Sequence, residues 1–377
     1  MSSSPQPAKS LRVVAIGGGT GLSTLLRGLK LYVPAPAASR RASDTGHPWP
    51  DSRRAGDAAA APRTTDSPAL RHNAPPLPCL IRDLAAIVTV TDDGGSSGRL
   101  REDLKMLPPG DVRNCMVALS EDEHLLAKLF QYRFEHGDLE GHSFGNLFVA
   151  ALSNITGDFA QAVQMSSQIL ATRGRIYPAT NVDVTLAAHM DNGSVVRGET
   201  SITASPHRIL ELRLEPSDAP PLPGTLGAIA NADLITLGPG SLYTSLITNL
   251  LVRGIPEAIA SSKATRVYVG NLMTQANESL GLTASQHIEK IMQHCGDSQL
   301  KLFDYALINT APISPSLLER YAREGQLPIE PDLDRIRSLG VEPIAGNFVH
   351  EGDLLRHDPD RVTAELLRLG LVGLAVA

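Results

Sequence analysis

Short apolar runs alternate with helically spaced leucines along the ordered parts of this 377-residue chain. Residues 13–16 and 86–90 are apolar and rich in β-branched side chains, as strands buried on both faces of a parallel sheet are. Between these runs, leucines recur at i, i+3, i+4 and i+7, which places them on one face of a helix: Leu22, Leu25, Leu26 and Leu29. The pattern predicts a strand, a helix and a second strand.

The same rhythm returns in the second half of the chain. Strands are predicted over residues 234–237, 266–269 and 305–308, and helices over 112–119, 124–134, 159–170 and 285–295. Alternating strands and helices with short loops favour an α/β fold with a doubly wound, mostly parallel sheet.

The middle of the chain changes to a period of two. Apolar residues alternate with polar or small ones over residues 182–188, which predicts a strand. Asn192-Gly193 predicts a hairpin turn, followed by a return strand over residues 195–202 and a third strand over 209–214. This predicts a small antiparallel excursion at about residues 181–216.

Residues 34–78 have neither period and are rich in proline, alanine, arginine and serine, which is typical of a disordered insertion. We therefore expect a single α/β domain over residues 11–377, interrupted by this insertion.

Composition narrows the classes of function. The net charge is −6, so nothing in the overall charge favours nucleic acid as a partner. Cys79, Cys115 and Cys295 are far apart and form no zinc or disulfide pattern. The polar N-terminus is unlike a signal peptide and no apolar run is long enough to span a membrane. These features predict a cytoplasmic protein.

Glycine-rich loops follow two of the predicted strands. In the first, Gly17-Gly18-Gly19-Thr20-Gly21, backbone N–H groups and a helix N-terminus can surround a phosphate. A dinucleotide fingerprint would need glycine at Leu22 or Thr24, and a Walker A loop would need a following Gly-Lys-Ser/Thr, so both are excluded. The second loop, GPGSLYTS at residues 238–245, offers Gly238, Gly240, Ser241 and Thr244, although Ser241 is equally suited to cap a helix.

Acidic residues stand at two further loops. Asp92 and Asp93 in DDGGSSG suit a sugar hydroxyl, a hard cation such as magnesium, or a turn cap. Asp111 in PPGDVRN is a candidate N-cap, and Asn271 in GNLMTQ offers hydrogen bonds to a base or a sugar.

The ordered set of motifs GGGTGLS, VTVTDDGGSSGRLR, PPGDVRN, HSFGNL, YPATN, GPGSLYTS and GNLMTQ closely resembles the YvcK-type gluconeogenesis factors, a branch of the CofD-like family. The resemblance implies a Rossmann-like fold. It also implies a nucleotide-diphosphate ligand, with residues 18–21 facing the diphosphate and Asn271 and residues 238–244 completing the pocket. Asp111 falls where the transferase branch has an acidic motif, which makes it the candidate catalytic residue.

Two hypotheses follow from this resemblance. The first is a UDP-sugar-binding regulatory protein that supports cell shape and peptidoglycan supply during gluconeogenic growth, with UDP-N-acetylglucosamine as ligand and with protein partners or a homo-oligomer expected. The second is a transferase that moves a phospholactyl group from a guanosine diphosphate donor to a deazaflavin, with magnesium held by Asp92, Asp93 or Asp111. The chain has Gly21-Leu22-Ser23 where the transferase branch has a Thr-Pro-Lys-like run, which favours the first.

Overall fold

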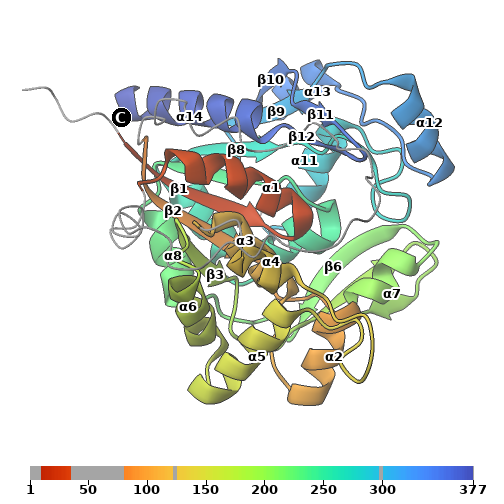
Figure 1. The fold of residues 1–377 in the computed structure, drawn as a ribbon. Helices are drawn as coiled ribbons and strands as arrows, with labels where there is room; N and C mark the ends of the chain where they lie inside the picture. The colour runs from red at the N-terminus through yellow and green to blue at the C-terminus, as the bar shows by residue number, and fades with distance from the viewer. Residues whose placement is uncertain (1–9, 35–79, 122–124, 297–299, 377) are drawn as a thin grey trace, which may run out of the picture.

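Seven parallel strands form the central sheet of the computed structural model, which describes residues 10–34, 80–121, 125–296 and 300–376. Their order across the sheet is β10-β9-β8-β7-β1-β2-β3 (Figure 1). The strands are β1 (Leu11–Gly17), β2 (Ile81–Val88), β3 (Arg175–Pro178), β7 (Leu234–Leu237), β8 (Thr265–Val269), β9 (Tyr305–Asn309) and β10 (Glu342–Gly346). The predicted Rossmann-like, doubly wound sheet is confirmed.

Helices cover both faces of this sheet. The chain leaves β1 in one direction for β2 and β3, and later returns to the other side of β1 for β7 to β10. Because parallel crossovers are right-handed, this reversal puts the two sets of connecting helices on opposite faces. α1 (Gly19–Leu29) packs against α3 (Gly110–Leu119) and α14 (Pro359–Val376), while α8 (Pro223–Ala230) packs against α10 (Ile255–Ser261).

The remaining helices connect these layers and surround the loops. Apart from α7, which is described below, those of the described residues are η1 (Lys30–Tyr32), α2 (Gly95–Leu104), α4 (Leu126–Gln131), α5 (Phe144–Thr156), α6 (Phe159–Ile169), η4 (Leu242–Ile247), α9 (Thr248–Leu250), α11 (Ala284–Gln293), α12 (Pro315–Arg323) and α13 (Leu333–Ser338). None of the described helices is both long and apolar enough to cross a bilayer.

The predicted antiparallel excursion is a three-stranded sheet in the order β5-β4-β6. Its strands are β4 (Thr185–Met190), β5 (Val195–Arg197) and β6 (Ile209–Glu215). The return strand predicted over residues 195–202 was wrong beyond Arg197, where α7 (Glu199–Ala204) begins. Gly198 has a φ of +89°, and the Asp93 carboxylate accepts hydrogen bonds from the Thr200 N–H (2.8 Å) and hydroxyl (2.6 Å), so a distant residue ends the strand.

Two other predicted boundaries differ. Residue 124 of the helix predicted over 124–134 lies outside the described residues, and the rest is helical only in α4 (Leu126–Gln131). Phe134 N–H donates to His142 O at 2.9 Å in an extended segment. A two-stranded sheet of β11 (Val349–Glu351) and β12 (Leu355–His357) was not predicted. The insertion predicted at residues 34–78 lies, apart from Pro34, outside the described residues, and the single-domain organisation stays a prediction.

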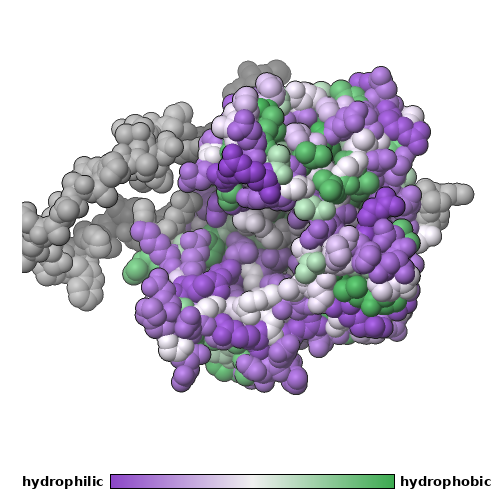
Figure 2. Space-filling model, turned by 90° about the vertical axis from the view of Figure 1, so that its right-hand side faces the viewer, coloured by the Kyte–Doolittle hydropathy of each residue, from purple (hydrophilic) through white to green (hydrophobic). Residues whose placement is uncertain are grey.

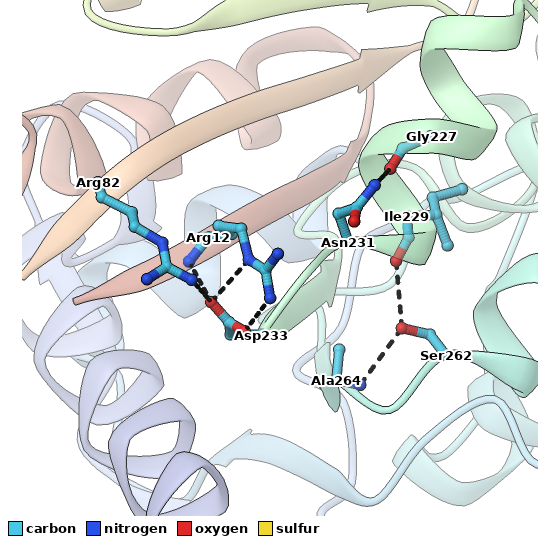
Figure 3. Close-up of polar contacts among 8 residues, drawn as sticks. All are labelled: Arg12, Arg82, Gly227, Ile229, Asn231, Asp233, Ser262 and Ala264. Atoms are coloured by element: carbon cyan, nitrogen blue, oxygen red, sulfur yellow. Dashed lines mark hydrogen bonds and ion pairs between the residues drawn. The ribbon is translucent and has the colours of Figure 1, made fainter. Parts of the chain in front are cut away.

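Two aspartates form charged contacts, here called clamps, that join neighbouring strands at the amino-terminal edge of the sheet. Asp233, just before β7, accepts hydrogen bonds from the Arg12 backbone N–H (2.8 Å) and from Arg12 Nη2 (2.7 Å) in β1. Arg82 of β2 reaches the same carboxylate at 3.3 Å (Figure 3). Asp304, just before β9, binds the backbone and guanidinium of Arg266 in β8 in the same way. Each carboxylate therefore fixes the start of the neighbouring strand.

Asp233→Ala is expected to lower the free energy of unfolding by about 2 kcal/mol, because the Arg12 N–H and guanidinium would lose their shared acceptor. Urea denaturation measures the change. Asp334→Ala is the matched control, because its ion pair with Arg337 is formed by a fully exposed carboxylate, and it should cost less than about 0.5 kcal/mol. Equal effects of the two substitutions would contradict a special role for the clamp.

Candidate functional site

The carboxyl ends of β1 and β7 form the point at which the strand order reverses. In open α/β sheets, ligands bind in the crevice outside such a point. The two predicted glycine loops follow these strands and meet there. A Cβ on Gly21 would lie 2.4 Å from Pro239 O and 2.9 Å from Gly240 N, so only glycine lets the loops approach this closely. Figure 2 shows this edge of the molecule hollowed at its centre.

The first loop turns directly into α1. Gly19 has a φ of +62°, and the N-cap Gly18 is extended with no side-chain cap. A Cβ on Gly18 would lie 2.6 Å from Asp111 Oδ2 and 2.8 Å from Thr89 Cγ2. The backbone is therefore closely packed on one side while the first turn of α1 faces the crevice, as the anion-binding hypothesis requires.

A cleft of about 330 Å³ opens beside this turn. It brings together five of the predicted residues: Thr20, Gly21, Gly240, Ser241 and Asn271. Ser241 Oγ accepts a hydrogen bond from Gln275 Nε2 at 2.9 Å, and η4 begins at the next residue without a side-chain cap from Ser241. The structure thus places Ser241 at the wall of the cleft rather than as a helix cap.

Several lining residues of the cleft were missed by sequence reasoning, and Tyr321 and Arg356 are the two that matter most for its chemistry. Tyr321 of α12 accepts a hydrogen bond from Leu355 N–H at 2.9 Å, which attaches α12 to β12. Arg356 of β12 is exposed and is the only lysine or arginine that lines the cleft within the described chain. They come from the C-terminal region and belong to no glycine-rich motif, so no sequence signal pointed to them.

Other predicted residues lie next to the cleft rather than in it. Gly238 has a φ of +89° and makes the turn out of β7. Thr244 is buried, and its hydroxyl donates to Glu278 Oε1 at 3.1 Å. The Tyr243 N–H also donates to Glu278, at 3.4 Å. The Glu278 carboxylate therefore occupies the N-terminus of η4 that the sequence suggested for a phosphate.

Asp111 lies on the other side of the first loop. It is near the N-terminus of α3, and the Gly19 N–H hydrogen bonds to its carboxylate. Burial and the nearby charge of Asp92 raise the pKa of Asp111 to about 6, against the lowering effect of Gly19 and Arg113. A carboxyl with this pKa exchanges its proton near neutral pH, as a general acid or base must.

Asp92 and Asp93 have different structural partners. Asp92 Oδ1 accepts a hydrogen bond from Gly94 N–H at 3.0 Å at the start of α2, and its Oδ2 points toward Gly110, where a Cβ would lie 2.7 Å away. Asp93 binds the N-terminus of α7 as described above. Within the described chain, no three histidine, cysteine, aspartate or glutamate side chains are placed to hold a metal ion. Magnesium at Asp92 and Asp93 stays a prediction.

Glu199 extends the acidic group and was also missed. Thr91 Oγ1 donates to Glu199 Oε2 at 3.3 Å. Burial, followed by the charges of Asp111 and Asp92, raises the pKa of Glu199 to about 9, and burial also raises the pKa of Glu278. Acidic side chains from four separate segments therefore converge beside the first glycine loop.

Fold and site together define a Rossmann-like α/β protein with a crevice between two glycine loops at the switch point of the sheet. The model of the 2-phospho-L-lactate transferase CofD family matches residues 13–349. The chain is 43% identical to the gluconeogenesis factor of Halalkalibacterium halodurans over 95% of this chain and 96% of that protein. It is 40% identical to the gluconeogenesis factor of Bacillus subtilis over 95% and 98% of the two chains.

Solved structures agree with these relatives. A crystal structure of a Bacillus halodurans protein superposes with a TM-score of 0.80 at 43% identity, over 95% of this chain and all of the other. The chain belongs to the CofD family, and within it to the YvcK-type gluconeogenesis factors.

Proposed function

We propose that this protein binds a UDP-sugar, with UDP-N-acetylglucosamine as the first candidate, and acts as a cytoplasmic regulatory protein. In this role it would support cell shape and peptidoglycan supply during growth on gluconeogenic carbon. The observation that carries the proposal is the cleft at the switch point, where Gly21 and Gly240 bring two strand-to-helix loops into contact.

The chemistry of the cleft suits a diphosphate joined to neutral groups. Apart from the Gly19 N–H, which donates to the Asp111 carboxylate, the first turn of α1 offers backbone N–H groups and the positive end of a helix dipole. Arg356 adds a single positive charge, and Ser241, Asn271 and Gln275 add neutral hydrogen-bonding groups suited to a sugar. His357, which also lines the cleft, binds Gly270 O at 3.0 Å, and burial lowers its pKa to about 4, so it is neutral at physiological pH.

Calorimetric titration of the full chain with UDP-N-acetylglucosamine tests the proposal. Saturable binding with one ligand per chain is expected, and UDP should compete for the same site. Absence of saturable heat with ligand at millimolar concentration would overturn the proposal.

Arg356→Ala should weaken UDP-N-acetylglucosamine binding by roughly tenfold to a hundredfold, because a charge-assisted contact to phosphate contributes about 1.5–3 kcal/mol. Arg356→Lys should recover only part of this loss, since lysine cannot bind two oxygens with a planar fork. Arg323→Ala is the control: Arg323 is exposed on α12 and does not line the cleft. If the affinity of Arg356→Ala for UDP-N-acetylglucosamine is unchanged, the diphosphate does not bind beside Arg356.

The transferase remains a second candidate, favoured by the CofD family model and by Asp111, whose pKa of about 6 suits proton transfer beside the glycine loop. Incubation with the guanosine diphosphate phospholactyl donor, a deazaflavin and magnesium, followed by mass spectrometry, tests it. Product that disappears in Asp111→Asn supports transfer, and no product at high protein concentration refutes it.

A further inference from the structure

Three surface helices of this protein contain no charged residue. They are α5, α6 and α8, of 13, 11 and 8 residues, whereas one residue in five is charged across the chain. The only other described helices without a charge are η4 and α9, and these are buried at every position. A helix that faces water normally has charged and polar residues on its outer face. The outer faces of α5, α6 and α8 therefore lack the charges of a permanently solvated surface.

The outer face of α6 is regular. Its exposed positions recur at i, i+3, i+4, i+7 and i+8, which is one face of a helix: Gln161, Gln164, Met165, Gln168 and Ile169. Met165 and Ile169 are 38% and 50% exposed, and Ile155 near the end of α5 is 77% exposed. Single exposed apolar side chains are common in proteins, but here they stand among neutral amides without any charge. Protein–protein interfaces have this composition, because Lys, Glu and Asp are depleted in them.

A groove of about 720 Å³ lies beside this face, between α6, the edge strand β3 and the start of α8. Its walls include three glutamines of α6 and Tyr177 of β3. Two charged residues line it within the described chain, and both have partners in the fold. Asp158 accepts a hydrogen bond from the Gln161 backbone N–H at 2.7 Å and caps α6, and Arg175 forms an ion pair with Asp83. The groove therefore extends the neutral face.

We propose that α5, α6 and α8, here called the neutral face, form the surface through which two copies of this chain associate as a two-fold symmetric dimer. Each copy has a net charge of −6, so two copies repel each other. This repulsion is screened between charges more than about 8 Å apart at physiological salt. The neutral face is the contact that two such chains make without bringing like charges together.

The glutamine side chains of α6 also suit a second copy. Those of Gln161, Gln164 and Gln168 make no hydrogen bond within the described part of the chain. An amide group is both a donor and an acceptor, so it can pair with an amide of the same kind. A two-fold contact places one surface against an identical surface, and it therefore needs groups that complement themselves. A charged partner would find no opposite charge on this face.

The size of the neutral face suits a stable dimer. At 1.5 Å per residue α5 and α6 are about 16–20 Å long, and α5, α6 and the groove beside α8, each about 10 Å wide, cover roughly 600 Å². A standard interface buries about 800 Å² of accessible surface per partner, which the relief of the side chains brings within reach. Figure 1 shows α8, β3, α6 and α5 along one side of the molecule, away from β12 and α12, so the dimer leaves the cleft open.

Sedimentation velocity of the full chain tests the proposal, and a dimer is expected at micromolar concentration. The double substitution Met165→Lys, Ile169→Lys should raise the Kd of the dimer about 100-fold or more, because it buries unpaired like charges in the contact. Both side chains are exposed in the single chain, and lysine is favourable near the C-terminus of a helix, so the fold should be retained. Circular dichroism and urea denaturation check this. Added lysines also reduce the net negative charge, so overall repulsion cannot explain a loss of the dimer.

Leu210→Lys is the matched control. Leu210 is 54% exposed on β6, outside the neutral face, and its substitution should leave the dimer unchanged. Gln164→Lys is the milder second variant, because it replaces one exposed polar side chain by another, and it should raise the Kd of the dimer about tenfold.

Three outcomes would overturn the proposal. One is a parent protein that stays monomeric at high micromolar concentration, and another is a dimer that persists unchanged in both lysine variants of α6. The third is a monomer that sediments with phosphatidylcholine vesicles, which would assign the neutral face to a lipid surface. None of these measurements depends on the ligand of the cleft, so the proposed function and the dimer are tested separately.

Discussion

Gly21→Ala should weaken UDP-sugar binding about 100-fold and destabilise the fold. The added Cβ would lie 2.4 Å from Pro239 O and 2.6 Å from Pro239 C, and these are backbone atoms that cannot rotate away. Separating the two loops should cost about 3 kcal/mol of stability, as overpacking of a close contact does. It should also weaken binding about 100-fold, because loss of two phosphate hydrogen bonds contributes about 3 kcal/mol. Calorimetry and urea denaturation of the same preparations measure both effects.

The control for this substitution is Gly227→Ala in α8. Gly227 is also helical, but apart from the backbone of its own helix no atom lies within 4 Å of the position that a Cβ would take. Alanine has the higher helix propensity, so this variant should gain about 0.5–1 kcal/mol. If alanine lowers the free energy of unfolding at Gly21 and raises it at Gly227, the contact between the loops rather than helix propensity decides the result at Gly21. A Gly21→Ala protein with normal affinity would contradict the placement of the diphosphate.

The central strands could be predicted from sequence because burial on both faces leaves a continuous apolar signal. β1, β7, β8 and β9 were found this way, and β7 is buried at every position. β3 and β10 were missed because they form the two edges of the sheet, where Arg175 and Glu342 are exposed and the strands read as loops. Position in the sheet, rather than local sequence, makes these segments strands.

The residues that line the cleft also fall into a group that could be predicted from sequence and a group that could not. Thr20, Gly21, Gly240, Ser241 and Asn271 were found because a loop after a buried strand leaves a recognisable run of glycines and small polar residues. Arg356 and Tyr321 reach the cleft only because β12 and α12 fold back over it, joined by the Leu355 N–H to Tyr321 hydrogen bond. Such a tertiary contact has no local pattern in the sequence.

The acidic residues show a related limit. The sequence suggested Asp92 and Asp93 as a pair because they are adjacent, but the fold directs Asp93 to the Thr200 N–H and places Asp92 near Asp111 and Glu199. Burial, and after it their mutual repulsion, raises the pKa values of Asp111 and Glu199. A bound cation would relieve this repulsion, and so would protonation. The protonation of Glu199 can be measured without any ligand.

Glu199→Gln should stabilise the protein at neutral pH. Because the pKa of Glu199 is about 9 in the fold and about 4.3 in the unfolded chain, the unfolded state loses this proton first as the pH rises. Stability from this group is therefore complete below about pH 4 and decreases from there up to about pH 9. Glutamine keeps the shape of the protonated side chain and does not ionise. The variant should match the parent near pH 4 and exceed it by about 3 kcal/mol at pH 7, at about 1.4 kcal/mol per pH unit.

Urea denaturation at several pH values, with Glu102→Gln as control, measures this difference. Glu102 is exposed on α2, so its substitution should change the free energy of unfolding by less than about 0.5 kcal/mol throughout. A gap between Glu199→Gln and the parent that does not grow between pH 4 and pH 7 would mean that Glu199 is ionised in the fold. If added magnesium removes the gap at pH 7, the cation binds beside the ionised carboxylate, because a cation replaces the proton as the partner of that charge. The size of the gap with and without magnesium therefore distinguishes a protonated acidic cluster from a metal-binding one.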